Sequence, residues 1–475
     1  MNRALYLSVP DPDNEDLIDT STAIAQSVDS SLANNYNELF IALANTYYDY
    51  KEKVKSSKSE GDFHGNRDFY HLIKNAIYQL IKKKDEINSL NKNHILTEIG
   101  LKSLERNFGG LPNSIDKMKE IFAQKFNEFT ENTVYNVLKC VKDNLEDYNS
   151  RFLLLVSKSS ISPYLVSYIL DSLEKNYIFL IGSNLKNDIK SAEKGGGYSE
   201  SLLNKVQFQM CNDSVLVLKN LEIIYPSLYD LFNQNYTKMG DKQFSKIAFA
   251  NAKSSSEVNR KFRVIVLVSQ EQIEQKKEDP PFLHRFEKHI ISIENFLPEE
   301  YIEIGQKIHK QIENIYSFNK NKKLMIELGH VLINCGLEEI EGLIYKIIND
   351  KSNEENIKEK SKKEIEDFII KEVYKKLVPT FCEDIIASVK YSGFELRNKP
   401  VANIIYEIYK NSARNNFEQF LKNSTKKKTI IYTFSNTSGE LIENPVIGIN
   451  NIEYTSETIN EKMIDSIKSE KDIVI

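Results

Sequence analysis

The sequence has no tryptophan, and its four cysteines lie far apart with no C-x-x-C pair (Cys140, Cys211, Cys335 and Cys382). This spacing argues against a zinc module or a disulfide framework, and it fits a reducing compartment. The chain also lacks an apolar run of about 18 residues and the N-terminal pattern of a leader peptide. We therefore expect a soluble, cytoplasmic protein with no transmembrane segment and no bound metal ion.

An excess of charge of either sign is also missing. The 475 residues include 63 Lys and Arg against 68 Asp and Glu, which gives a formal net charge of −5. Such a balance does not create the general positive field that attracts nucleic acid or an anionic membrane, so we expect no nucleic-acid partner. Both ends of the sequence are apolar and strand-like, ALYLSV near the start and DIVI at the end. This pattern predicts a piece of a longer polypeptide.

Two regions have the spacing of amphipathic helices, with apolar residues three and four positions apart. The first covers residues 12–150 and is broken by loop-like stretches at 55–65 and 109–112. Taken alone, it predicts a plain helical bundle. The second runs from Pro298 to about residue 425, and the segment TIIYTFSNTS (429–438) then predicts a further strand.

Between the two helical regions, four short runs rich in Val, Ile and Leu predict buried strands. They are residues 152–157, 177–183, 214–220 and 262–269. Nearly continuous apolar runs are typical of parallel strands that are covered on both faces. Because helical segments alternate with these runs, the sequence predicts an α/β fold with a parallel sheet.

The chemistry of nucleotide hydrolysis is missing from this predicted sheet. The strand 214–220 ends on Lys219-Asn220, where an ATPase of this type would carry an acidic pair that holds Mg²⁺. A phosphate-binding loop needs glycines followed by Gly-Lys, because backbone N–H groups and the lysine neutralise the phosphates. The loop after the first strand, which starts at Ser157-Lys158, has no glycine, and Gly-Lys occurs nowhere in the chain. We expect no ATP hydrolysis by this sheet.

Three arginine motifs are candidates for contact with a phosphate outside the sheet. Arg285 lies in PPFLHRFEKH (280–289), and Arg3 lies in the similar MNRAL. Arg285 either reaches a phosphate on a neighbouring subunit or module, or is a surface charge paired with Glu287. Arg67 opens an amphipathic helix in GNRD, where the alternative is an ordinary helix start in which Asp68 favours the helix dipole.

Six segments of the chain, in order, resemble the AAA+ core of the mysterin family. These are giant ring-finger proteins that join a dynein-like AAA+ motor to an E3 ubiquitin ligase. The resemblance lies within about residues 1–300, and LYDLFNQNY and HRFEKH are its most specific parts. The segments are NRALYLSVPDPDNEDL, DFHGNRDFYHLIK, LERNFGG, SRFLLLVSKS, YPSLYDLFNQNY and PPFLHRFEKHIISIENFL.

The resemblance implies an AAA+-type parallel sheet with a degenerate nucleotide site, flanked by helical lid domains. Residues 1–150 would be the end and lid of a preceding AAA+ module, and residues 151–297 the degenerate α/β domain. Residues 298–425 would be the lid of that domain, and residues 426–475 the start of a further module. ATP and Mg²⁺ would bind in the neighbouring module only.

The family also implies roles for single residues. Arg285 and Arg3 would be catalytic arginine fingers, Arg67 would touch the nucleotide as a sensor-2 arginine, and Ser269 would stand at a sensor-1 position. The chain would then be a structural and regulatory segment that supports ATP hydrolysis by the preceding module. Its partners would be adjacent AAA+ modules of the same polypeptide, and the ubiquitin machinery would be reached through ring-finger domains outside this sequence. The alternative is a non-enzymatic protein-interaction scaffold.

Overall fold

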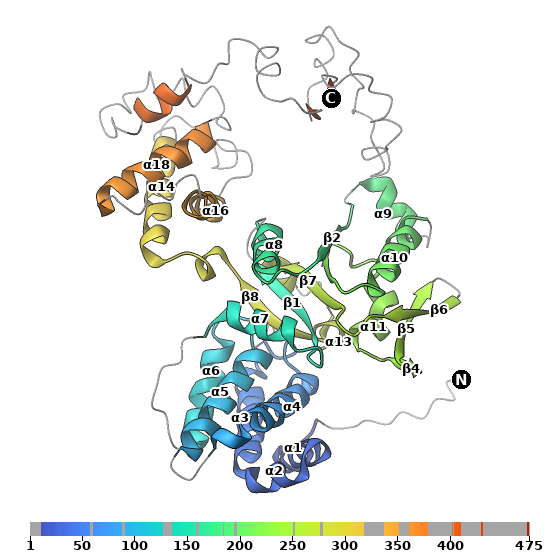
Figure 1. Cartoon of the computed structure of the whole chain (residues 1–475). Coiled ribbons are helices and arrows are strands. Elements are labelled where there is room, and N and C mark those ends of the chain that lie inside the picture. The colour runs from blue at the N-terminus through green and yellow to red at the C-terminus, as the bar shows by residue number, and fades with distance from the viewer. Residues whose placement is uncertain are drawn as a thin grey trace. The chain divides into compact units, whose positions relative to one another are not determined.

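The fold comes from a computed structural model of the chain (Figure 1). It describes residues 11–57, 60–87, 91–126, 135–157, 161–183, 185–193, 197–249, 252–275, 279–317, 337–350, 361–378, 401, 403–409, 429–430 and 473–474. The chain divides into two compact units. The first comprises residues 1–182 and 199–291, and the second comprises residues 183–198 and 292–475.

The N-terminal part of the first unit is helical, as its apolar spacing predicts. The first helix starts with a capping box, in which the side chains of Asp13 and Asp16 each accept a hydrogen bond from the other's backbone N–H. The helices enclose a core that includes Phe40, Tyr47, Tyr50, Phe69, Phe108 and Phe122. Their bounds are α1 (Asn14–Val28), α2 (Ser30–Asn35), α3 (Asn37–Val54), α4 (Asn66–Lys82), η1 (Lys84–Glu86), α5 (Lys92–Asn107), α6 (Ser114–Lys125) and α7 (Val137–Glu146).

A parallel sheet of five strands follows in the same unit, and its order is β2-β3-β7-β1-β8. The predicted α/β class is therefore confirmed, and the sheet is consistent with an AAA+ fold. The central strands β1, β3 and β7 are almost wholly buried, which explains their continuous apolar runs. The strands are β1 (Phe152–Ser157), β2 (Tyr177–Ile181), β3 (Val215–Lys219), β7 (Arg263–Ser269) and β8 (Phe286–Ile291).

Strand β8 corrects the interpretation of the segment after Pro280. The sequence predicts four strands and none in this segment, whereas the structure has a short helix, α13 (Pro280–Leu283), and then the fifth strand. The polar residues Glu287, Lys288 and His289 hid this strand, because they interrupt the apolar pattern. All three side chains are nevertheless buried.

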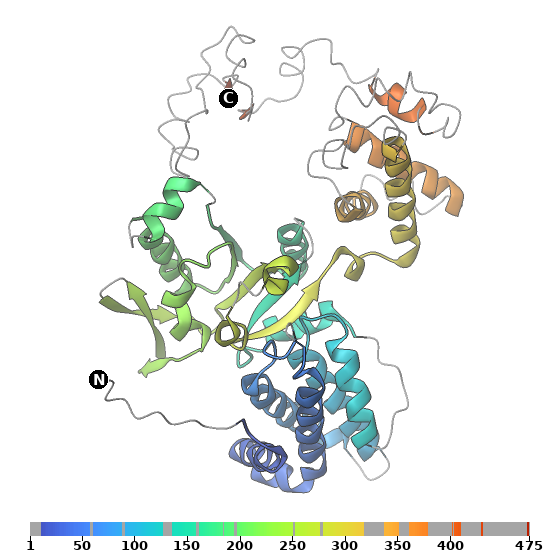
Figure 2. The ribbon, with the colours of Figure 1, turned by 180° about the vertical axis from the view of Figure 1, so that it is seen from behind.

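The connections between the strands are helical except for one antiparallel hairpin sheet, β4-β5-β6, that the sequence did not predict. The two views in Figures 1 and 2 show the helices α1–α6 gathered beside β8 and β1, and α5 and α7 both contact β8. The connecting elements are α8 (Ser162–Ser172), α10 (Gly197–Met210), η2 (Tyr225–Leu228), α11 (Tyr229–Phe232), β4 (Thr237–Met239), β5 (Lys242–Phe249), β6 (Ala252–Val258) and α12 (Gln270–Glu274).

The second unit contains the predicted helices after Pro298. Its fully buried side chains include Ile308 and Ile312 of α14, Ile340 and Ile344 of α16, and Tyr374 of α18. Only the first two residues of the predicted strand 429–438 are described, and they pair in parallel with β10. None of the helices within the described ranges is both long and apolar enough to cross a bilayer. The elements are α9 (Lys186–Glu193), η3 (Ile293–Asn295), α14 (Glu299–Ser317), α16 (Leu337–Ile348), α18 (Lys362–Leu377), β9 (Thr429–Ile430) and β10 (Ile473–Val474).

Candidate functional site

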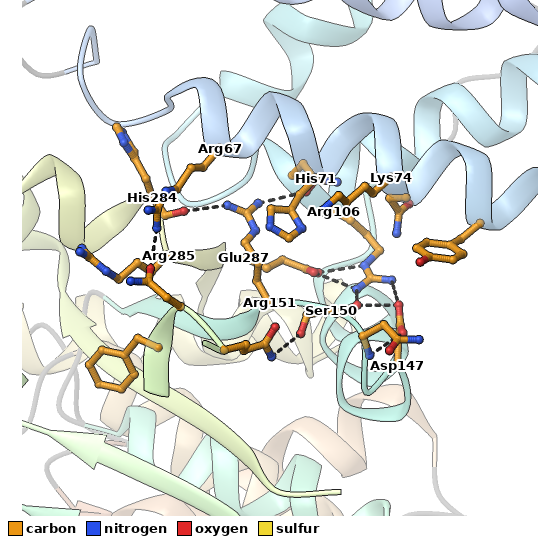
Figure 3. A pocket seen from close by; sticks show the side chains of 17 residues that line it. Arg67, His71, Lys74, Arg106, Asp147, Ser150, Arg151, His284, Arg285 and Glu287 are labelled. Atoms are coloured by element: carbon orange, nitrogen blue, oxygen red, sulfur yellow. Dashed lines mark hydrogen bonds and ion pairs between the residues drawn. The ribbon is translucent and has the colours of Figure 1, made fainter. Parts of the chain in front are cut away.

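Two of the three predicted arginines come together in the first unit. Arg67 lies in the first turn of α4, and Arg285 lies between α13 and β8. Both line two cavities, of about 380 Å³ and about 700 Å³, whose shared rim also includes His284. Figure 3 shows the smaller cavity with both arginines labelled. Arg3 lies outside the described residues, so its role stays a prediction.

Arg285 is held by an aromatic ring rather than by a carboxylate. Its guanidinium carbon lies 3.8 Å from the centroid of the Tyr229 ring, and its Nη1 donates to the carbonyl of Pro281. Its Nε is buried and has no hydrogen-bond partner among the described residues. Burial lowers the pKa of Arg285, and the nearby charge of Arg67 lowers it further. The alternative pairing with Glu287 is wrong, because Glu287 binds Arg106 instead.

Arg67 is exposed, and its Nη1 lies 2.5 Å from Asn233 Oδ1, in the segment after α11. The neighbouring Asp68 accepts a hydrogen bond from the backbone N–H of Gly65 at 2.9 Å. The predicted role of Asp68 at a helix start is therefore confirmed. Its other contacts reach much further along the chain.

Asp68 is the centre of a buried ion cluster that joins α4 to the sheet. Its Oδ1 lies 2.7 Å from Arg151 Nη1, at the start of β1, and 2.7 Å from Lys288 Nζ in β8. Asp68 and Lys288 are fully buried. Burial alone would raise the pKa of Asp68, but the charges of Lys288 and Arg151 hold it well below its ordinary value. The carboxylate is therefore ionised and fixes α4 against both strands.

A second buried cluster, around Glu287, joins α5 and α7 to β8. The carboxylate accepts from Arg106 Nε at 3.0 Å and Nη2 at 2.8 Å, and from Asn144 Nδ2 at 2.7 Å. His289 lies 3.1 Å from the same carboxylate and 2.6 Å from the hydroxyl of Tyr135. Burial opposes ionisation of Glu287, but Arg106 and His289 hold its pKa below the ordinary value. Like the Asp68 cluster, this one ties a helix that precedes the sheet to strand β8.

Two glycines allow the helical part to approach β8 and the residues before it closely. A Cβ atom at Gly65 would lie 2.4 Å from the ring of His284, and one at Gly109 would lie 2.4 Å from the carbonyl oxygen of Lys288. Gly109 needs glycine, because the atom that it approaches belongs to the backbone, whereas a side chain at position 65 would force the ring of His284 to shift. The loop chemistry predicted at residues 109–112 thus also serves packing. The two glycine contacts and the two ion clusters together set the positions of Arg67 and Arg285.

In an active α/β module, a nucleotide would bind at the carboxyl ends of the parallel strands. Ser157 and Ser269 are register partners there at the ends of β1 and β7. Ser269 caps α12, because its hydroxyl accepts from the N–H of Gln272 at 3.1 Å. Lys219 ends β3, and Asn220 follows it with a φ of 55°. Within the described ranges, no group of three or more His, Cys, Asp or Glu could hold a metal ion. Lys158 lies outside those ranges.

Sequence reasoning missed the residues that hold the arginines in place. Arg106 and Asp68 lie in LERNFGG and DFHGNRDFYHLIK, two of the segments that carry the family resemblance. No local pattern shows that their partners lie about 180 and 220 residues further along the chain. Pairing over such distances depends on the packing of the whole unit.

Comparison with known proteins finds similarity to one family. Residues 142–297 match the family model described as the RNF213 AAA domain. The E3 ubiquitin-protein ligase rnf213-beta of Danio rerio is 29% identical over 299 residues, which are 61% of this chain and 5% of that protein. The E3 ubiquitin-protein ligase RNF213 of Homo sapiens is 21% identical over 440 residues, 89% of this chain and 8% of its own length. The E3 ubiquitin-protein ligase RNF213 of Mus musculus is 23% identical over 322 residues, which are 65% of this chain and 6% of that protein.

The chain therefore spans less than a tenth of the length of these relatives. RNF213 is the protein also called mysterin, so the resemblance found in the sequence is confirmed. The chain is therefore similar to an AAA+ segment of RNF213, and its residues 142–297 match the model of the RNF213 AAA domain.

Proposed function

We propose that this chain is a structural and regulatory AAA+ segment that completes the ATP site of a preceding module in the same polypeptide. The observation that carries the proposal is the meeting of Arg67 and Arg285 at the shared rim of two cavities. Guanidinium groups suit the charged oxygens of phosphates, and an arginine supplied by a neighbouring module is a recurrent device in ATP hydrolysis.

In this proposal, α3 and α4 belong to the lid of the preceding module, and the sheet belongs to the next one. The larger cavity favours this division because it is lined by both, with Lys51 and Arg67 on one side and Pro281 and Arg285 on the other. The proposed boundaries are those expected from the family: residues 1–150, 151–297, 298–425 and 426–475. The passage of the chain from the first unit to the second after Ile291 supports a lid after the sheet.

ATP and Mg²⁺ would bind with the phosphate loop and acidic pair of the preceding module, and not at residues 151–297. Arg67 and Arg285 would bind and orient the terminal phosphates and stabilise the charge that develops there during hydrolysis. The buried clusters around Asp68 and Glu287 would hold the segments that carry the two guanidinium groups at fixed positions relative to each other. Bound ATP supplies the phosphoryl group for transfer, and the residues of this chain supply only positive charge and position.

The relatives are named E3 ubiquitin-protein ligases. We propose that the polypeptide that contains this chain also transfers ubiquitin, through ring-finger domains outside this sequence. We further propose that this polypeptide lies in the cytoplasm. Adjacent AAA+ modules would be the direct partners of this segment.

The test is ATP turnover by a full-length RNF213-like protein with Arg285→Ala. Complete loss of an arginine finger costs about 10³–10⁵ in rate, and we expect a loss of about tenfold or more here. The matched control is Arg260→Ala, because Arg260 is an exposed arginine beside the hairpin sheet, away from both cavities. Turnover that is equal in the two variants would favour the non-enzymatic scaffold.

A further inference from the structure

The segment LYDLFNQNY (228–236) contacts both arginines at the rim of the two cavities. It contains the short helix α11 and then Asn233, whose N–H donates to the carbonyl of Tyr229 at 2.9 Å. Tyr229 and Asn233 are four residues apart in this helical turn, so they lie on the same face of it. The guanidinium of Arg285 lies over the Tyr229 ring, and Asn233 Oδ1 accepts from Arg67 Nη1. One turn of helix thus contacts both guanidinium groups.

These two contacts hold the arginines without neutralising their charge. Within the described part of the chain, neither Arg67 nor Arg285 forms an ion pair. The buried Arg106 and Arg151 of the same unit are instead paired with carboxylates. A tyrosine ring and an amide oxygen are uncharged, so they leave the full positive charge of a guanidinium available to an anion. The charge of Arg67 and Arg285 therefore serves something other than the fold.

Aromatic packing fixes α11 against the segment that carries Arg285. The ring centroid of Phe232 in α11 lies 6.0 Å from that of Phe282 in α13 and 5.0 Å from that of Phe286 in β8. All three rings are almost fully buried. At the end of the segment, Gln234 Nε2 donates to the carbonyl of Ser150 at 3.0 Å. A rotation of α11 would disrupt these contacts, so the face with the two arginine contacts has a fixed direction.

We propose that Tyr229 and Asn233 are positioning residues, which set the separation and direction of Arg285 and Arg67. The proposal rests on the function proposed above, in which both arginines act on one ATP. Burial lowers the pKa of Arg285 and the charge of Arg67 lowers it further, because the two cations repel each other. The ring of Tyr229 and the amide of Asn233 hold the guanidinium groups in place against this repulsion.

The first test is ATP turnover by a full-length RNF213-like protein with Tyr229→Leu, which removes the ring but keeps an apolar side chain. We expect kcat to fall about three- to tenfold and KM to change less than about twofold, because Arg285 acts on the charge that develops during hydrolysis. Tyr229→Phe keeps the ring and should restore most of the rate. The control is Tyr164→Leu, since Tyr164 is an exposed tyrosine of α8 that lines neither cavity.

Two comparisons separate positioning from a merely structural effect. A positioning residue acts only through its arginine, so Tyr229→Leu combined with Arg285→Ala should be no slower than Arg285→Ala alone. Asn233→Asp nearly preserves the shape of the side chain but pairs Arg67 with a carboxylate, so this variant should be slower than Asn233→Ala by about twofold or more. Losses that multiply in the Tyr229 double variant, or equal rates of the two Asn233 variants, would overturn the proposal.

The contact with the ring is measured directly by NMR of labelled arginine side chains in the 475-residue chain. A ring shields protons above its face, so the guanidinium N–H signals of Arg285 should move downfield in Tyr229→Leu and stay near their place in Tyr229→Phe. Arg285→Ala identifies these signals by their loss. Signals that do not move in Tyr229→Leu would overturn the proposal. The measurement needs no ATP, so it is decided separately from the proposed function, which fails if Arg285→Ala leaves turnover unchanged.

Discussion

At the scale of single residues, the site depends on one aspartate between two buried cations. Asp68 Oδ1 contacts Arg151 and Lys288, each at 2.7 Å, and its Oδ2 accepts from the N–H of Gly65, the residue before α4. Removing one member of a buried ion pair leaves an uncompensated charge, which costs more than the pair itself contributes. Asp68 therefore has a larger effect on the fold than its place beside the exposed Arg67 suggests.

Asp68→Asn should lower the free energy of unfolding by about 3–5 kcal/mol, because Arg151 and Lys288 would lose their shared counter-charge. Urea unfolding measures the change, and Asp116→Asn, at an exposed position in α6, is the control. Because the folded-state pKa of Asp68 is lowered, its stabilising effect is present above the unfolded-state pKa of about 4 and is lost as pH falls below it. A loss under about 1 kcal/mol at neutral pH would contradict the cluster.

A second residue-scale prediction concerns Glu341 in the second unit. Its side chain is only 2% exposed in α16, and burial together with Glu294 and Glu338 raises its pKa to about 7. A raised pKa means that the folded state holds the proton more tightly. The stabilisation is therefore present below about pH 4.5 and is lost as pH rises through about 7.

Glu341→Gln should stabilise α14 and α16 by roughly 1–3 kcal/mol at about pH 8, since the amide cannot ionise. Hydrogen exchange of the backbone amides of these helices in the intact chain measures the effect. Glu339→Gln, in the same helix at a less buried position, is the control. If protection in the Glu341 variant matches that of the native chain at this pH, the raised pKa is wrong.

At the scale of elements, the sequence predicts strands well where apolar residues run together and poorly where buried charges interrupt them. β1, β2, β3 and β7 were predicted from their Val, Ile and Leu runs. β8 was missed because Glu287, Lys288 and His289 are buried only with partners from α4, α5 and the segment before α7. The hairpin sheet β4-β5-β6 was missed for a different reason, since its strands are polar and lack an apolar run.

Prediction of the candidate site from the sequence was limited in a similar way. Arg67 and Arg285 could be named from short motifs, whereas Arg106 and Arg151 could not, because their roles come from contacts between distant segments. Single arginines at element ends are visible in a sequence. The ion pairs that position them depend on the tertiary structure.

The turn after β2 supplies a prediction for an element. A Cβ atom at Gly182 would lie 1.7 Å from the carbonyl oxygen of Asn220, whose φ of 55° already places the chain after β3 in a tight turn. Gly182→Ala should therefore separate the ends of β2 and β3 and cost about 2 kcal/mol or more in the free energy of unfolding. Gly197→Ala is the control, because a Cβ atom there meets nothing within 4 Å. Equal stabilities of the two variants by urea unfolding would contradict this close approach.

At the scale of the whole molecule, the first unit combines helices that precede the sheet with the sheet itself. Two buried ion clusters and two close glycine contacts hold these parts together. In the function proposed above, a movement of one module's lid would move the arginine of the next module directly. Regulation of a neighbouring ATP site would then need no nucleotide chemistry in residues 151–297.

The most direct test of this account is ATP turnover by a full-length RNF213-like protein with Arg67→Ala, Arg285→Ala and both changes together. Residues that act on one nucleotide are not independent, so the double variant should be hardly slower than the slower single variant. Turnover at the native rate in the Arg285 variant, or fully multiplicative losses in the double variant, would contradict a shared ATP site at the rim where Arg67 and Arg285 meet.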